Sequence, residues 1–357
     1  LGAHPQGPSR VRIDGVEESL DRLLEKHAID ILGEKTAATF HNRLPFLLKV
    51  LDVKKMLSIQ LHPNKQQAEQ GFARENRLGI PLQAHHRNYR DDNHKPEVHV
   101  ALSGFWMLHG FRPLREIAEI FSTKPSFHSI AQQSQQYLRQ IAGGHMTEEQ
   151  ALKALYARVM TMPQPQVDAV LQPAIDAAAQ QYQAGALSKS SADFWAVRAA
   201  GQFAPTNGSF DRGIFSIYLL NLVSLEPGQG TFQDAGTLHA YLEGQNIELM
   251  ANSDNVLRGG LTSKHVDIPE LLKTVRFTPG RPAILSGSPL CENELCFETP
   301  VNDFELRQIT LGESEKYRRS PQSNIDFFWI AAGCLEVEHK EGKSIFTKGE
   351  AFLARAQ

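Results

Sequence analysis

The stretch Gly-Gln-Gly-Thr-Phe-Gln-Asp-Ala-Gly-Thr-Leu-His-Ala-Tyr, residues 228–241, is the most informative about the architecture of this chain. Gly228 and Gly236 permit tight turns, because glycine lacks a Cβ atom and adopts backbone angles that other residues avoid. His239 follows the second turn, and on a strand of a β-barrel its side chain would project inward. A single histidine more often serves packing or lies on the surface, so this segment by itself predicts strands and turns and not yet a site.

Residues from two other segments complete a candidate metal-binding set with His239. Gln60 and His62 lie in Ser-Ile-Gln-Leu-His-Pro, and their i, i+2 spacing places both on one side of a strand. Glu97 follows Asn-His-Lys-Pro and enters an apolar run, where a carboxylate needs a metal or a basic partner. His99 shares the face of Glu97 and is a weaker candidate. Two His, one Glu and one Gln suit a divalent transition metal.

Three charged residues stand in contexts that suit catalysis or structure. Lys49 lies in the apolar run 46–51, where burial would lower its pKa, although a lysine can also reach solvent from an edge strand. Asp254 and Arg258 lie in residues 251–262, which are rich in small polar side chains, as active-site loops are. The Arg258 guanidinium could bind an anion through two parallel hydrogen bonds, or it could form an ordinary ion pair with an acidic residue on the surface.

The middle of the chain has a composition and a spacing of apolar residues that are typical of helices. Alanine and glutamine are abundant there, and Thr147 with Gln150 forms the pattern of a capping box. Apolar residues follow at helical spacing through residues 152–160. Residues 168–183 are expected to form a second helix, with Pro173 near its first turn or breaking it. Residues 214–225 are apolar and, with the segments after them, predict a return to strands.

The predicted fold class is therefore mainly β with an α-helical insertion. Two β regions with short apolar runs and turn residues flank the helical region, which is typical of a β-sandwich enzyme interrupted by helices. The last region contains three further expected strands, at residues 327–332, 334–339 and 344–347.

Composition excludes several classes of function. With 37 Lys and Arg against 40 Asp and Glu, and no long basic run, the chain is not expected to bind nucleic acid. It has no apolar stretch of transmembrane length and no signal peptide. The 3 cysteines form no Cys-x-x-Cys pair, which indicates reduced thiols and a cytoplasmic protein. The sequence starts at Leu1 without Met and stops at Gln357, so we expect a fragment trimmed at both ends.

Several long segments, taken together, resemble the type I mannose-6-phosphate isomerases (phosphomannose isomerases) of the cupin superfamily. The pattern from Gly228 to His239 is similar to the second cupin motif, with Asp234 in place of its usual Pro. Ser263 stands where the family usually has a second Pro, and the lysine that follows it in the family pattern is present here. The segments that carry the resemblance are Leu-Pro-Phe-Leu-Leu-Lys-Val-Leu (44–51), Leu-Ser-Ile-Gln-Leu-His-Pro-Asn-Lys (57–65), Asn-His-Lys-Pro-Glu (93–97), Gly-Thr-Leu-His-Ala-Tyr-Leu (236–242) and Met-Ala-Asn-Ser-Asp-Asn-Val-Leu-Arg-Gly-Gly-Leu-Thr (250–262).

The resemblance implies a domain organisation and an activity. It implies a discontinuous cupin (jelly-roll) catalytic domain at residues 1–112 and 206–287, a helical domain at 113–205, and a truncated second cupin-like domain at 288–357. It implies a monomeric enzyme that holds one Zn²⁺ per chain and interconverts mannose 6-phosphate and fructose 6-phosphate through an enediol. Its partner would be a small sugar phosphate, with no nucleic acid and no membrane.

The resemblance also assigns roles to individual residues. Arg258 corresponds to a catalytic position, and Ser58 and Lys264 correspond to positions associated with the substrate phosphate. The zinc ligands would be Gln60, His62, Glu97 and His239. The proton carrier stays open among four active-site positions, which are Lys49, His94, Lys95 and Asp254.

Two other functions fit parts of the same pattern. His62, Glu97 and His239 also describe the iron site of a cupin dioxygenase, although a fourth ligand at Gln60 disfavours an oxygenase, which needs open positions. A sugar-phosphate sensor on the same fold would bind the ligand without turnover. Metal content, oxygen uptake and turnover of mannose 6-phosphate separate these functions.

Overall fold

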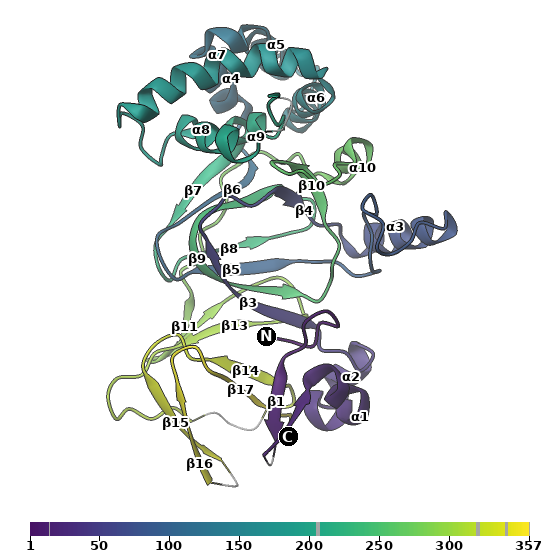
Figure 1. The fold of residues 1–357 in the computed structure, drawn as a ribbon, viewed down its shortest axis with the longest axis vertical. Coiled ribbons are helices and arrows are strands. Elements are labelled where there is room, and N and C mark those ends of the chain that lie inside the picture. Colours follow the sequence, from purple (N-terminus) through teal and green to yellow (C-terminus); the bar gives the residue numbers. More distant parts are fainter. Residues whose placement is uncertain (14, 205–207, 319–321, 340–341, 357) are drawn as a thin grey trace. The chain divides into compact units, whose positions relative to one another are not determined.

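The computed structural model describes residues 1–13, 15–204, 208–318, 322–339 and 342–356 (Figure 1). The chain forms two compact units. The larger unit comprises residues 49–290 and 295–308, and the smaller comprises residues 1–48, 291–294 and 309–357. The domain boundaries expected from the sequence stay a prediction.

An 8-stranded sheet is the centre of the larger unit. Part of it runs in the order β10-β4-β9-β5-β8, while β9 also pairs with β3 and β6, and β6 pairs with β7. Residues 239–243 of β9 pair with β6 and residues 246–250 pair with β5, so this one strand joins two parts of the sheet. The strands are β3 (Phe46–Val53), β4 (Ile59–Leu61), β5 (Glu97–Ala101), β6 (Phe105–Phe111), β7 (Leu220–Leu225), β8 (Gly230–Gln233), β9 (His239–Ala251) and β10 (Leu257–Gly260).

Helices inserted between the neighbouring strands β6 and β7 gather at one end of this unit (Figure 1). The expected capping box is confirmed. The backbone N–H of Gln150 donates to Thr147 Oγ1 at 3.2 Å, and the Gln150 side-chain oxygen accepts from the backbone N–H of Thr147 at 2.9 Å. The apolar face that follows it is fully buried. The helices are α4 (Leu114–Ser122), the 3₁₀ turn η1 (Pro125–Phe127), α5 (His128–Ala142), α6 (Glu148–Thr161), α7 (Gln164–Gln183), α8 (Ala192–Gln202) and α9 (Ile214–Leu219).

Two expectations about this region were wrong. Residues 214–219 form helix α9 and not a strand, and β7 begins only at Leu220. All six α9 residues are buried, so the segment shows no polar face from which a helical period could be read. Helix α7 begins at Gln164 and continues through Pro173, which neither starts nor ends it. A proline inside a helix removes one hydrogen bond, and the buried apolar face of α7 offsets that loss.

Two further helices and a small sheet lie wholly or mostly in the larger unit. Helix α3 (Lys65–Arg77) begins with a capping box in which Asn64 and Gln67 bond each other's backbone N–H groups. Helix α10 (Ile268–Thr274) is capped by Asp267, which accepts from the Glu270 N–H. The three-stranded sheet runs in the order β11 (Ser288–Cys291), β12 (Glu294–Phe297) and β13 (Leu306–Ile309).

The smaller unit has its own apolar core, which includes Leu20, Leu24, Leu32 and Ile325. The strands expected in the last region are confirmed, although β14 ends at Trp329 and not at residue 332. The elements are the hairpin β1 (Arg10–Ile13) and β2 (Val16–Ser19), the helices α1 (Leu20–Leu32) and α2 (Glu34–Thr39), and the strand pairs β14 (Asp326–Trp329) with β17 (Ala351–Ala354) and β15 (Cys334–His339) with β16 (Gly342–Thr347).

The described chain is thus a mixed α/β structure with a large sheet, and helices outside the insertion make it less dominated by strands than the mainly β class expected from the sequence. Within the described ranges, no helix combines the length and the apolar character needed to span a membrane.

Candidate metal centre

Sheet register brings three of the expected site residues into one row. Arg258 on β10 lies directly opposite Gln60 on β4, and Gln60 lies directly opposite His239 on β9. Residues that face each other across adjacent strands project to the same side of a sheet. The arginine, the glutamine and the histidine therefore point into the same space, although they are far apart in sequence.

His62 and Glu97 complete a tight cluster with His239. His62 Nε2 lies 3.3 Å from Glu97 Oε1, and His239 Nε2 lies 3.5 Å from Glu97 Oε2. The two imidazole centroids are 5.2 Å apart. All three side chains are at most 2% exposed. One ligand atom from each of the three residues lies within 4.8 Å of the others, so the cluster could hold a single metal ion.

Backbone carbonyls fix the tautomer of both histidines. His62 Nδ1 lies 2.7 Å from the carbonyl oxygen of Asn255, and His239 Nδ1 lies 2.9 Å from that of Thr237. A carbonyl oxygen can only accept, so each Nδ1 must carry the proton and donate it. In a neutral imidazole the Nε2 atom then bears a lone pair, and both Nε2 atoms face the Glu97 carboxylate.

His62 and Glu97 present lone pairs to the centre of the cluster. Burial, with help from the nearby Lys95, lowers the pKa of His62 to about 4, so its Nε2 carries no proton at neutral pH. Among the described residues, His62 Nε2 and both Glu97 oxygens are buried without a hydrogen-bond partner, even though the Lys95 ammonium lies 3.2 Å from Oε1. Buried lone pairs that face each other are costly unless a cation lies between them. The donor set of two imidazoles and a carboxylate fits a zinc ion.

Electrostatics keep Glu97 ionised in this buried place. Burial alone would raise the pKa of its carboxyl group, but the charges around it, among them the Lys95 ammonium 3.2 Å away, more than offset that effect and hold the pKa well below the usual value. A metal ligand must be deprotonated, and Glu97 meets that requirement.

Gln60 lies beside the cluster, where its amide Nε2 is 3.4 Å from His239 Nε2. The amide oxygen and nitrogen of a glutamine exchange places when χ3 rotates by half a turn. A rotated Gln60 would therefore present its oxygen Oε1 as a fourth ligand, beside the two histidine nitrogens and the glutamate oxygen. His99 lies outside the cluster, because Gln233 Nε2 meets its Nδ1 at 3.2 Å and its ring packs 5.2 Å from that of Tyr241.

A turn and a loop hold the histidines in place. The Gly236 N–H donates to the His62 carbonyl oxygen at 2.8 Å, and Gly236 has a φ of +76°. A Cβ atom there would meet Thr274 O at 2.8 Å, so this turn requires the glycine that the sequence pattern singled out. Asn255, whose carbonyl accepts from His62, uses its side-chain amide to bond the carbonyls of Asp91 and Asn93 at 2.8 Å each.

Arg258 supplies positive charge that no acid neutralises. Its side chain is half-buried and forms no ion pair or hydrogen bond with any residue in the described ranges. Burial and the nearby Arg90 both lower its pKa, and the group still stays protonated at neutral pH. Two guanidinium groups close together without a carboxylate form a natural binding place for an anion.

The structure changes the interpretation of Lys49. Burial lowers its pKa, as expected, but Glu248 lies 2.8 Å away and reverses the sign, so the net pKa is raised. The prediction of a depressed pKa was wrong, because it could not include a partner from the distant strand β9.

The remaining expected site residues have the following surroundings. His94 Nε2 lies 3.0 Å from Asp303 Oδ1. Asp254 is exposed, and its backbone N–H donates to Asp91 Oδ2 at 2.7 Å. Ser58 is half-buried, while Lys264 is exposed on the segment that follows β10.

Sequence reasoning missed the residues that position this site. Asp211 accepts from the backbone N–H groups of Gly213, Leu261 and Thr262 at 2.7, 3.0 and 3.0 Å, and so anchors the segment that leads to Lys264. Asn255 lies within the polar run at 251–262, so that run was a usable signal. Asp211 lay in no pattern that points to its role.

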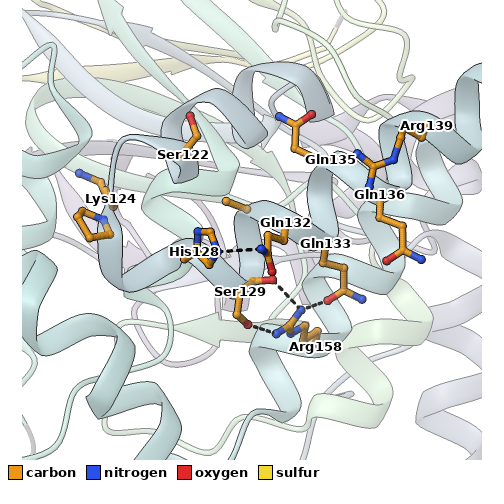
Figure 2. Close-up of a pocket in the computed structure, with 12 residues that line it drawn as sticks. Ser122, Lys124, His128, Ser129, Gln132, Gln133, Gln135, Gln136, Arg139 and Arg158 are labelled. Atoms are coloured by element: carbon orange, nitrogen blue, oxygen red, sulfur yellow. Dashed lines mark hydrogen bonds between the residues drawn. The ribbon is translucent and has the colours of Figure 1, made fainter.

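A cavity of about 860 Å³ lies elsewhere and is lined mainly by residues of α5, with Ser122 of α4 and Arg158 of α6 (Figure 2). Arg158 reaches from α6 to Gln133 and Ser129 of α5 within it. No residue expected at the site lines this cavity.

The large sheet and its buried two-histidine, one-carboxylate cluster define a metalloenzyme with one metal centre on a β scaffold. The model of the phosphomannose isomerase type I catalytic domain matches residues 1–114. The chain belongs to the mannose-6-phosphate isomerase family.

Full-length relatives and solved structures support this assignment. The chain is 37% identical to the mannose-6-phosphate isomerase of Escherichia coli K12, covering 99% of this chain and 89% of that protein. It is 33% identical to the human enzyme, covering 89% of this chain and 73% of that protein. The Salmonella typhimurium enzyme bound to substrate and zinc has a TM-score of 0.83 at 33% identity, covering 100% of this chain and 85% of that one. A zinc-bound mannose 6-phosphate isomerase has a TM-score of 0.81 at 34% identity.

Proposed function

We propose that this chain is a zinc-dependent aldose–ketose isomerase that interconverts mannose 6-phosphate and fructose 6-phosphate by proton transfer through an enediol. One observation carries the proposal: the buried His62, Glu97 and His239 offer ligand atoms that lie within 4.8 Å of one another, so that one metal ion can bind to all three. A similar structure, that of the Salmonella typhimurium enzyme, has substrate and zinc bound, which supports the proposal.

The proposed architecture is that of the family. The large sheet would form a cupin catalytic domain, the helices from Leu114 to Gln202 a helical domain, and the last strands a second cupin-like domain. The described strand pairing and the helical insertion support this division. A monomeric state and a cytoplasmic location stay predictions.

Zinc, when bound by His62, Glu97, His239 and a rotated Gln60, would order the pocket and polarise sugar oxygens. Arg258 lies in the next strand, opposite Gln60, on the same side of the sheet. Its unneutralised guanidinium would stabilise the negative charge that develops on O1 or O2 in the enediolate.

The phosphate would be held at the far end of the substrate from the reacting carbons. Lys264 and Ser58 would bind it, and Arg90 adds positive charge near Arg258. Asp211 keeps the segment before Lys264 in place through three backbone hydrogen bonds. Binding energy from the phosphate would then orient the reacting carbons.

The four candidate proton carriers divide into two classes. Lys49 and Lys95 are each paired with a carboxylate, so as ammonium groups they can donate a proton but not accept one. His94 and Asp254 remain as bases. His94 has a ring oriented by Asp303, which is the arrangement of a positioned general base, and we propose it as the proton carrier.

A cupin dioxygenase is the alternative that uses the same ligands. The position of Gln60 beside the cluster argues against it, because a fourth protein ligand leaves too few open positions for oxygen chemistry.

Turnover of mannose 6-phosphate in D₂O tests the activity and the enediol together. The proposal expects fructose 6-phosphate with deuterium at C1, because a proton carrier that exchanges with solvent delivers the new hydrogen. Product that still carries no deuterium after many reversible turnovers would indicate direct hydride transfer and refute the enediol, because a proton carrier exchanges with solvent over repeated cycles. Zinc-loaded protein that binds the sugar phosphate without any product would refute the isomerase and support a sensor.

A further inference from the structure

Three exposed histidines lie together on the larger unit, outside the buried metal cluster, and one of them, His265, directly follows Lys264. His85 and His86 are neighbours in the segment between α3 and β5, and His265 lies in the segment between β10 and α10. Their ring centroids are 5.0 Å (His85–His86), 6.3 Å (His85–His265) and 6.4 Å (His86–His265) apart.

These distances are close to those of a metal-binding set. Imidazole nitrogens bind zinc at about 2.0–2.1 Å, which in tetrahedral geometry places two ring centroids about 5 Å apart. The two histidines of the buried centre show that spacing, with centroids 5.2 Å apart. The His85–His86 pair already meets it. His265 must approach by about 1 Å, which rotation about exposed side-chain bonds can supply.

The ring nitrogens of the three histidines are available. Within the described ranges, none of them takes part in a hydrogen bond or ion pair, and all three side chains are exposed. The rings meet edge to face, at interplanar angles of 77–85°. A shared metal would need their nitrogens to turn toward one point, which packing does not prevent at the surface.

We propose that His85, His86 and His265 form a second site for a divalent transition metal, completed by water. Imidazole is the commonest protein ligand for zinc, copper and nickel, and three imidazoles suffice for a four-coordinate ion. The site is open and needs ring rotation before it closes, so it binds more weakly than the buried centre. A bound ion ties the segment before β5 to the segment after β10.

The test is a titration with Co²⁺, whose visible absorption strengthens when it enters a four- or five-coordinate protein site. Metal-free protein is first loaded with one equivalent of zinc, which fills the tighter, buried centre. Wild type is then expected to bind one further equivalent of Co²⁺ with a visible band. The His265→Gln protein and the His85→Gln/His86→Gln protein are expected to lose it.

A matched control uses His145, an exposed histidine on the segment between α5 and α6. The His145→Gln protein is expected to keep the second equivalent. Zinc-loaded wild type that binds no Co²⁺, or a His265→Gln protein that binds it as tightly as wild type, overturns the proposal.

The result is independent of the proposed activity, because it measures metal bound and not turnover. A His62→Gln protein, which lacks a ligand of the buried centre, is titrated with Co²⁺ without prior zinc, because that zinc would otherwise occupy the surface histidines, and it is expected to keep the weaker Co²⁺ site. Loss of the Co²⁺ absorption band in the His62→Gln protein would show that the band came from the buried centre and would also overturn the proposal.

Discussion

Replacing Glu97 with glutamine tests the metal centre while changing almost no volume. In the structure the two carboxylate oxygens face His62 Nε2 at 3.3 Å and His239 Nε2 at 3.5 Å. The amide keeps the shape but removes the negative charge that a divalent cation needs. It also leaves the buried Lys95 ammonium, now 3.2 Å from Oε1, without an ionic partner.

The expected magnitude follows from metal-linked stability. Losing a residue that merely supports a metal ligand costs about 10–100-fold in affinity, so losing the charged ligand itself should cost at least about 100-fold. Free zinc at 100 times the wild-type Kd stabilises the fold by about 2.7 kcal/mol. The same zinc concentration is only equal to the Kd of the variant, so zinc stabilises the variant by only about 0.4 kcal/mol.

Thermal unfolding at one buffered zinc concentration, with and without metal, measures this difference. The zinc-induced rise in Tm should shrink about sevenfold in Glu97→Gln. Glu248→Gln is the matched control, because Glu248 is also a buried carboxylate paired with a lysine, Lys49, but belongs to no metal cluster. The control should keep the full rise. An undiminished zinc response in Glu97→Gln would refute the assignment of this cluster.

Three further predictions concern the site and its support. Arg258→Met should lower kcat by about 10²–10³-fold with unchanged zinc content, because it removes the group that stabilises the enediolate. A decrease in kcat of less than about tenfold in steady-state kinetics would contradict that role. Asp211→Asn should raise the KM for mannose 6-phosphate more than it lowers kcat. It should also destabilise the fold by about 2 kcal/mol, because the new side-chain N–H₂ faces backbone N–H groups. An unchanged KM would count against the anchoring of the Lys264 segment. Burial and His109 lower the pKa of His99 to about 3, whereas the unfolded side chain binds a proton below about pH 6.5, so stability falls as the pH drops through this range. Metal-free His99→Gln should therefore lose about 2 kcal/mol less than wild type between about pH 7.5 and 5, and equal shifts in their urea midpoints would show the reasoning to be wrong.

The His62, Glu97 and His239 cluster could be anticipated from the sequence, because each of its three segments carries a local signal of its own. The i, i+2 spacing of Gln60 and His62 placed them together, Pro96 marked the entry of Glu97 into a buried strand, and Gly236 marked the turn before His239. The structure brings the histidines and the glutamate together, with Gln60 beside them.

The parts that could not be predicted depend on distant partners or on missing periodicity. The sign of the Lys49 pKa shift depends on Glu248, and the orientation of His94 depends on Asp303, both remote in sequence. Helix α9 is buried on every side, so its apolar run could not be told from a strand. Pro173 lies in a helix whose tertiary packing outweighs the local preference.

Turnover of mannose 6-phosphate as a function of zinc added back to metal-free protein tests the metal-dependent isomerase itself. A coupled assay for fructose 6-phosphate gives the rate, and elemental analysis gives the metal content. The account predicts no turnover without metal and a linear rise that levels off at one equivalent of zinc per chain. Turnover by protein proven free of metal, or none by folded protein that holds one zinc, would contradict it.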